Sequence, residues 1–424
     1  MDITQGLQSL LAVFVVAALT PVIAAALPGP RIPQVVFFLI GGVIIGPHAL
    51  GVADTGSVQL VADAGLGFLF LLAGYELEPA LLKERPGRLG IIGWLVSVAL
   101  SLGVTAILQA TGFVHDYVPI ALALTTTALG TLLPILHASN MLGGAFGRYV
   151  FAAGAVGELF PILAIAVFLT QGSHFAALLS VGAVGLLAVA LATVPFFVRG
   201  ERLRTIIREG QNSTGQVMLR WSVVLLFALL VIAAHFGQDV VLGAMLAGMV
   251  LRGWTRRMGI DVHGLEQKFD AVGYGIFIPV FFVASGMTLD IGGIAHNPLR
   301  VLIFFALLLV IRGLPSLVIY RRVLPLRQRV EMTFITATAL PLLVALAEIG
   351  LRDGRMLPSN AAALVGAGVL SVLVFPAIAT AMARKDKVLP EAPEVAEAAE
   401  VAGAAELTPP AARPAPDNLL PGDR

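Results

Sequence analysis

Apolar stretches long enough to cross a bilayer recur along almost the whole chain, and they restrict its fold more than any other feature does. Of the 424 residues, 58% are hydrophobic and only 12% are charged, a balance that no soluble core of this size could bury. A transmembrane barrel would instead show alternating segments of about ten residues. The sequence therefore predicts an all-α polytopic membrane protein surrounded by a lipid bilayer.

Loops rich in Gly, Pro and charged residues divide the chain into thirteen predicted transmembrane helices. Their ranges are 7–27, 33–50, 58–77, 89–111, 118–137, 148–171, 174–198, 216–236, 239–254, 266–289, 298–322, 328–350 and 358–383. The transmembrane domain is thus expected over residues 1–383. Residues 384–424 are rich in Ala, Pro and Glu, which predicts a disordered tail, because such a composition cannot bury a core.

The Lys and Arg residues gather in the loops that follow the odd-numbered spans, most densely between residues 199 and 208, 252 and 268, and 321 and 329. The opposite loops hold only Arg300, Arg352 and Arg355. Because short cytoplasmic loops carry an excess of Lys and Arg, the N-terminus is predicted outside and the C-terminus in the cytoplasm.

The chain also repeats itself weakly. The segment around Gly74 resembles the segment around Gly286, an offset of 212 residues, and Thr127 in a Thr-Thr-Ala-Leu segment matches Thr338 in Ala-Thr-Ala-Leu, an offset of 211. Spans 1–6 are therefore predicted to recur as spans 8–13, with span 7 between them, and seven crossings make the second copy inverted. Inverted repeats are typical of secondary transporters, whose sites lie near the membrane midplane. The alternative is a chance match of Gly and Leu in apolar sequence.

The fifth span of each predicted repeat should be a broken helix. One carries Thr125, Thr126 and Thr127 in succession, and the other carries Thr338 shortly before Pro341. Proline removes a backbone donor and β-branched residues restrict rotamers, so both helices are weakened in the middle of the membrane. Two crossed broken helices would present half-helix ends able to hold a cation or balance a charge. Alternatively, the Thr hydroxyls simply bond to the preceding turn.

Three charged residues are the candidates for function. Glu158 lies inside the apolar span 148–171, where a carboxylate must pair, bind a cation or stay protonated. Arg312 lies deep in span 298–322 and needs a partner, for which Glu158 or the carbonyl end of a broken helix is the obvious choice. Asp63 is a candidate access residue. The structural alternatives are a protonated Glu158 that packs helices together and an Arg312 that only clamps helix ends.

Several classes of function lack their chemistry in this sequence. There is no hydrolase nucleophile elbow, no phosphate-binding loop and no cluster of ligands at metal-binding spacing, so neither an enzyme nor a cofactor is expected. Its Lys and Arg do not form a basic face with interleaved aromatic residues, which argues against nucleic-acid binding.

Segments 65–77, 281–287 and 336–342 resemble the cation:proton antiporter superfamily, in the branch of Kef-type and bacterial sodium/proton exchangers. The resemblance covers about residues 7–383 and implies a scaffold of spans 1–3 and 8–10, a mobile core of spans 4–6 and 11–13, span 7 as a linker, and a homodimer. It also implies that an acidic residue in span 6 binds the cation and that a basic residue in span 11 faces the crossing. Glu158 and Arg312 match these positions, although the family's acidic pair is here Gly157-Glu158.

The function predicted from these features is antiport of Na⁺ or K⁺ against H⁺ across the cytoplasmic membrane of a bacterium. Cation and proton would compete for Glu158, with help from the oxygens of Thr126, Thr127 and Thr338, and the lack of a second carboxylate at Gly157 predicts electroneutral exchange. One alternative is an ion-coupled symporter of an organic anion, for which Arg312 would be the cation in the core. Another is a membrane sensor or scaffold that does not transport.

Overall fold

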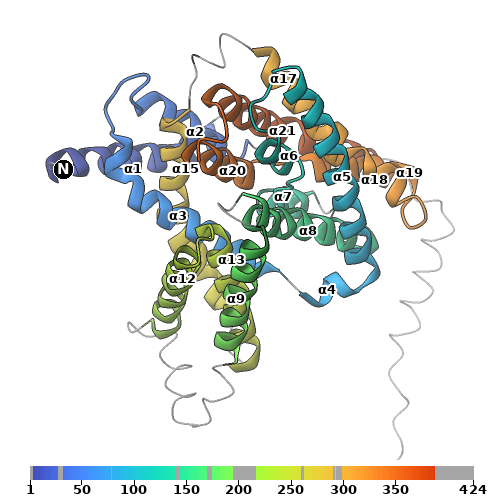
Figure 1. Ribbon diagram of the computed structural model, residues 1–424, viewed down its shortest axis with the longest axis horizontal. Helices are drawn as coiled ribbons and strands as arrows, with labels where there is room; N and C mark the ends of the chain where they lie inside the picture. Colours follow the sequence, from blue (N-terminus) through green and yellow to red (C-terminus); the bar gives the residue numbers. More distant parts are fainter. Residues whose placement is uncertain are drawn as a thin grey trace, which may run out of the picture.

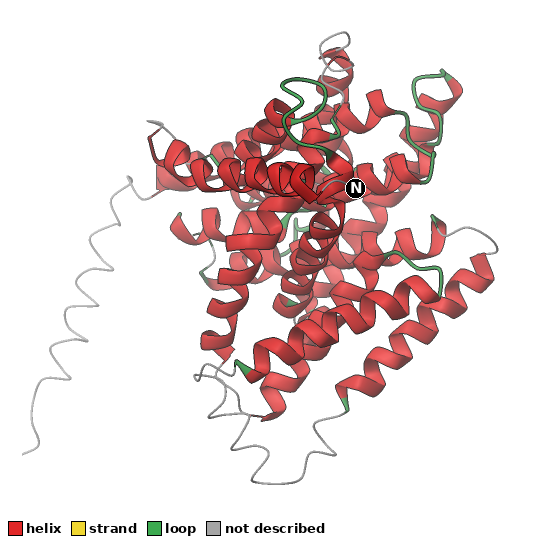
Figure 2. Cartoon of the chain, turned by 90° about the vertical axis from the view of Figure 1, so that its left-hand side faces the viewer, coloured by secondary structure: helices red, strands yellow, loops and turns green. Residues whose placement is uncertain are grey.

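The computed structural model describes residues 3–26, 32–77, 79–139, 141, 143–169, 174–193, 216–258, 262–289, 292 and 298–386. All regular secondary structure in these ranges is helical, as Figure 2 shows. The last helix ends at Asp386, so nearly all of the predicted tail lies outside the described residues, as does the Arg-rich loop at 199–208.

The chain forms the following elements in order, with two π-helical turns labelled η. They are α1 (Ile3–Ala26), α2 (Gln34–Ile45), α3 (Thr55–Glu76), α4 (Pro79–Lys83), α5 (Arg85–Ala110), α6 (Tyr117–Ala123), α7 (Leu129–Ala138), α8 (Gly144–Phe168), α9 (His174–Ala192), α12 (Val217–His235), α13 (Val240–Met258), α14 (Val262–Val272), η1 (Gly273–Phe277), α15 (Ile278–Met287), α17 (Pro298–Leu307), η2 (Leu308–Gly313), α18 (Pro315–Ile319), α19 (Leu326–Ala337), α20 (Pro341–Arg352) and α21 (Pro358–Asp386).

Ten helical segments among the described residues are long and apolar enough to cross a membrane. The protein is therefore a multi-pass, all-helical membrane protein, as predicted. The predicted span 118–137 is divided into the short helices α6 and α7, and α2 is an apolar helix of 12 residues. A count of thirteen spans and an inverted relation between two halves stay predictions.

The helices pack in two groups. In one, α3 packs on α13 and α15, α2 packs on α15, and α12 packs on α13. In the other, α5 packs on α6 and α8, while α17, α19 and α20 pack on α21. Figure 1 shows the first group on the left and the second on the right, with α9 contacting both α8 and α13. The roles of scaffold, mobile core and linker for these elements stay predictions.

Glycine residues let the helices of the first group approach very closely. A Cβ atom added at Gly74 of α3 would lie 2.1 Å from the carbonyl oxygen of Met245, and one added at Gly248 of α13 would lie 2.1 Å from that of Leu71. Helices in lipid associate through close van der Waals contact between small residues rather than through the hydrophobic effect. The α3–α13 contact therefore depends on these two glycines.

Replacing Gly248 by Ala should destabilise the protein, because the added methyl group forces α3 and α13 apart. Overpacking of this kind costs about 1–3 kcal/mol. The control is Gly103→Ala on α5, where an added Cβ meets no atom within 4 Å. Thermal unfolding in detergent should show a lower melting temperature for Gly248→Ala alone, and equal melting temperatures for the two variants would contradict the role of this contact.

Candidate functional site

Two interrupted helices meet inside the second group of helices. One interruption separates α6, which ends at Ala123, from α7, and the other separates α19 from α20, which begins at Pro341. The two breaks bond directly to each other: the amide of Ala128 donates to the carbonyl of Thr338 at 2.8 Å, and the Thr127 hydroxyl donates to the carbonyl of Thr336 at 2.7 Å. Each break thus satisfies part of the hydrogen bonding that the other leaves open.

Glu158 lies on α8 against the first break and is 8% exposed. Its Oε1 accepts hydrogen bonds from the amides of Leu129, at 2.8 Å, and Gly130, at 3.3 Å. These amides belong to the first turn of α7, where no carbonyl of the same helix is available to them. An N-terminal helix end carries partial positive charge, so it stabilises a buried carboxylate without a cationic side chain.

Arg312 lies on η2 and is 3% exposed. Its Nε donates to the Thr127 hydroxyl at 2.9 Å, and its Nη2 donates to the carbonyl of Ala153 on α8 at 3.0 Å. Within the described residues no ion pair joins it to Glu158. In place of the two partners expected from the sequence, Arg312 bonds to a hydroxyl group at the first break and to a carbonyl inside a neighbouring helix.

Gly157 explains why this chain has no acidic pair. A Cβ at this position would lie 2.6 Å from Nη2 of Arg312 and 2.6 Å from the Thr127 hydroxyl oxygen. Its carbonyl also accepts a bond of 3.0 Å from the amide of Thr127. The space that a second carboxylate would need is thus filled by the guanidinium and the first helix break.

The other two predicted threonines are buried, but they bond within their own helices. The Thr126 hydroxyl donates to the carbonyl of Ala123 at 2.8 Å, and that of Thr338 donates to Phe334 at 3.0 Å. In the described part of the chain neither hydroxyl bonds to Glu158. Each oxygen keeps lone pairs that could still accept or coordinate. The structure therefore brings Thr127 and Arg312 together beside α8, the helix that carries Glu158. Thr126 and Thr338 lie at the two breaks, and among the described residues their hydroxyls do not bond to this group.

Ser371 on α21 is a residue that the sequence reasoning missed. Its hydroxyl oxygen accepts from the amide of Ala339 at 3.1 Å and lies 3.0 Å from the carbonyl of the same residue, so it satisfies the second break. A single serine in an apolar helix is not a signal by itself. The predicted repeat register does not locate it either, because an offset of 212 from Glu158 leads to Leu370.

Asp63 lies elsewhere, in a polar cluster between α3 and the end of α20. Its Oδ1 is 2.7 Å from Nη2 of Arg352 and accepts a bond of 3.0 Å from Gln59. This cluster does not contact Glu158, so Asp63 is not part of the binding constellation.

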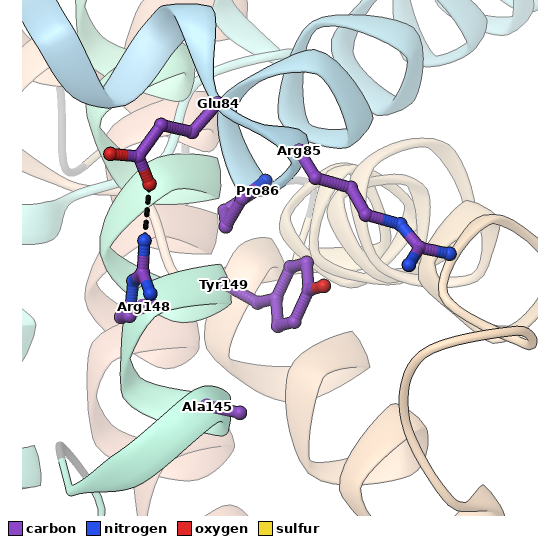
Figure 3. A pocket seen from close by; sticks show the side chains of 6 residues that line it. All are labelled: Glu84, Arg85, Pro86, Ala145, Arg148 and Tyr149. Carbon is purple, nitrogen blue, oxygen red and sulfur yellow. Dashed lines mark hydrogen bonds and ion pairs between the residues drawn. The ribbon is translucent and has the colours of Figure 1, made fainter.

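A separate surface pocket lies at the start of α5 and α8 (Figure 3). Glu84 points at Arg148 and forms an ion pair with it, and the ring of Tyr149 lies beside them. Arg148 and Glu158 are ten residues apart on one helix, which corresponds to about 15 Å. The pocket is therefore distinct from the helix crossing and includes none of the predicted site residues.

Known proteins resemble this chain along most of its length. The family model described as "Sodium/hydrogen exchanger, transmembrane" matches residues 12–385. A relative from Bacillus subtilis named "Putative Na(+)/H(+) antiporter YjbQ" is 25% identical over 394 residues, which cover 88% of this chain and 62% of the relative. The glutathione-regulated potassium-efflux system protein KefC of Escherichia coli K12 is 27% identical over 291 residues, covering 66% of this chain and 45% of KefC. The chain thus spans less than two thirds of the length of these relatives.

Among solved structures, the sodium proton antiporter MjNhaP1 from Methanocaldococcus jannaschii has a TM-score of 0.66 and 18% sequence identity, with 91% of this chain and 99% of that one covered. At this level of identity the likeness shows a shared fold. Because the family model matches nearly all of the residues that form helices, the chain belongs to the sodium/hydrogen exchanger family.

Proposed function

We propose that the protein exchanges a monovalent cation, Na⁺ or K⁺, for H⁺ at Glu158. The observation that carries this proposal is the position of the carboxylate: within the described residues, both of its hydrogen bonds fall on Oε1, from the amides of Leu129 and Gly130. Oε2 is left to bind a cation or a proton. A buried carboxylate with one bonded oxygen and one open oxygen is suited to alternate occupancy.

Coupling follows from the cost of burying charge. With Glu158 ionised and empty, its carboxylate carries a negative charge to which no cationic side chain bonds among the described residues, and this charge opposes movement through the hydrocarbon layer. A bound cation or a bound proton neutralises it, and both cannot bind at once. Oxygens of Thr126, Thr127 and Thr338 would complete the shell of a cation. The names of two relatives, a Na(+)/H(+) antiporter and a potassium-efflux protein, support a monovalent cation as the substrate class.

We also propose that the protein lies in the bacterial cytoplasmic membrane, with the N-terminus outside, and that it forms a homodimer through the first group of helices. The distribution of Lys and Arg supports the orientation. The apolar residues of α1 that remain exposed, such as Leu7, Leu11 and Leu19, support contact with lipid or with a second copy.

Replacing Glu158 by Gln should abolish exchange, because the amide cannot take up a proton or neutralise a cation. The measurement is dequenching of a pH-sensitive dye in everted vesicles on addition of Na⁺, K⁺ or Li⁺. The control is Glu84→Gln, a substitution of a surface carboxylate outside the helix crossing that should leave exchange unchanged. Cation-dependent dequenching by a folded Glu158→Gln variant would refute the proposal.

Exchange should be electroneutral. Gly157 leaves no room for a second carboxylate, so one carboxylate carries one cation in one direction and one proton in the other. In proteoliposomes, the rate of Na⁺ or K⁺ exchange should not change when a membrane potential is imposed with an ionophore. A rate that follows the imposed potential would show a different stoichiometry and would leave the role of Glu158 intact.

Arg312 is proposed to position the crossing rather than to touch the substrate, since it bonds to Thr127 and Ala153. Replacing Thr127 by Ala should therefore destabilise the fold by about 1–3 kcal/mol, because it leaves buried polar groups of Arg312 and Thr336 unpaired. The matched control Thr127→Ser keeps the hydroxyl and should melt close to the wild type. A melting temperature as high for Thr127→Ala as for Thr127→Ser would contradict this clamp.

The same bonds weigh against the organic-anion symporter. A substrate carboxylate would have to displace Thr127 and Ala153 from the guanidinium of Arg312. Thermal stabilisation by Na⁺ or K⁺, and none by carboxylates, separates the two functions. Cation flux in the vesicle experiment excludes a sensor that does not transport.

A further inference from the structure

The end of α20 is tied to the other group of helices by a compact polar cluster. Nη2 of Arg352 lies 2.7 Å from Asp63 on α3 and 2.6 Å from Glu348 on α20 itself. Nε2 of Gln59, one turn before Asp63 on α3, lies 3.0 Å from Asp63 and 3.4 Å from Glu348. The guanidinium of Arg352 and the amide of Gln59 thus each bond to both carboxylates. The cluster spans the boundary between the two groups of helices.

A third helix joins this cluster. The hydroxyl of Ser285 on α15 donates to Oε2 of Glu348 at 3.4 Å, so α20 is tied to both α3 and α15. Figure 1 shows α20 beside α15 at this place. The ion pairs Glu84–Arg148 and Asp116–Arg355 do not cross this boundary, because each joins residues within the second group.

Tyr274 lies on the other side of the helix crossing. Tyr274 on η1 is 49% exposed. Its hydroxyl would lie 4.0 Å from a Cβ atom added at Gly130, the residue at the start of α7 whose amide donates to Glu158. On the side of the cluster, Ala345 lies one turn deeper than Glu348 on the same face of α20 and is 0% exposed. The chain is thus closed beneath the cluster on the side of Asp63.

We propose that Gln59, Asp63, Glu348 and Arg352 form a latch that holds the site closed on one side of the membrane and must separate for the site to open there. This inference rests on the proposed exchange, which requires that Glu158 be reachable from one side at a time. The Lys and Arg distribution assigns the latch to the outer side. Asp63 therefore controls access without binding the transported ion.

The strength of the cluster suits a contact that opens in every cycle. Its charged side chains are between 19% and 45% exposed, so each ion pair is weak in the presence of water and salt. Two carboxylates that share one guanidinium and one amide nevertheless favour a single geometry. The latch biases the protein toward the closed side without trapping it there.

The chain contains no cysteine, so a single introduced thiol reports conformation cleanly. Ala345→Cys is the reporter, labelled in intact cells with a maleimide that does not cross the membrane. With the latch intact, labelling should be slow. Adding Arg352→Gln or Asp63→Asn should speed labelling by about threefold or more, which corresponds to the weakening of a partly exposed ion pair. The two substitutions together should add little, since each breaks the same contact.

Asp116→Asn is the matched control, because it weakens an ion pair of the same 2.7 Å length within one group, and it should not change the labelling rate. An unchanged rate in both Arg352→Gln and Asp63→Asn would overturn the latch. If Glu158→Gln loses exchange and the latch variants label faster, both proposals are supported. If Glu158→Gln retains exchange, only the proposed role of Glu158 is refuted.

A second measurement tests whether the latch must open. Cysteines replacing Gln59 and Glu348 are joined by a short, reducible bifunctional thiol reagent. Cross-linking should stop cation–proton exchange in proteoliposomes, and reduction of the cross-link should restore it. Full exchange by cross-linked protein would overturn the proposal, because the two groups would then move without separating at this point.

Discussion

The bonds between Glu158 and the first amides of α7 are the interaction on which the rest of the site depends. A carboxylate in an apolar helix is costly unless something balances it. Here the balance comes from a helix end rather than from a cationic side chain, and a helix end exists in mid-membrane only because α6 and α7 are separate helices. The broken helix is thus the source of the electrostatic environment that lets one acid bind.

The break is itself stabilised by its neighbours. Its backbone groups bond to the second break and to the carbonyl of Gly157, and Arg312 holds Thr127 against α8. Because Gly157 has no side chain, the guanidinium and the threonine can approach α8 closely enough to do this. The bond between Arg312 and Thr127 beside α8 and the absence of a second carboxylate therefore have one physical cause, which is the close approach at Gly157.

The polar cluster between the two groups differs from the glycine packing inside the first group. Within the first group, glycines bring backbones into direct contact, and such packing does not slide easily. Between the groups, the cluster of Asp63, Glu348 and Arg352 is polar and partly exposed. Contacts of this kind can separate and re-form at little cost, which is what the proposed latch requires.

The sequence by itself determined the helical membrane fold, the places of the two helix breaks and the identity of Glu158 and Arg312 as buried charges. These follow from hydropathy, from Thr, Gly and Pro in mid-span, and from the cost of charge in lipid, all of which are local properties. Only the tertiary structure decided the partners. It placed Glu158 on the α7 amides, Arg312 on Thr127, Ser371 on the second break and Asp63 in the latch. Such contacts join residues 29, 185, 32 and 289 positions apart, and which of several donors reaches a buried acceptor depends on how the helices pack, which no local pattern specifies.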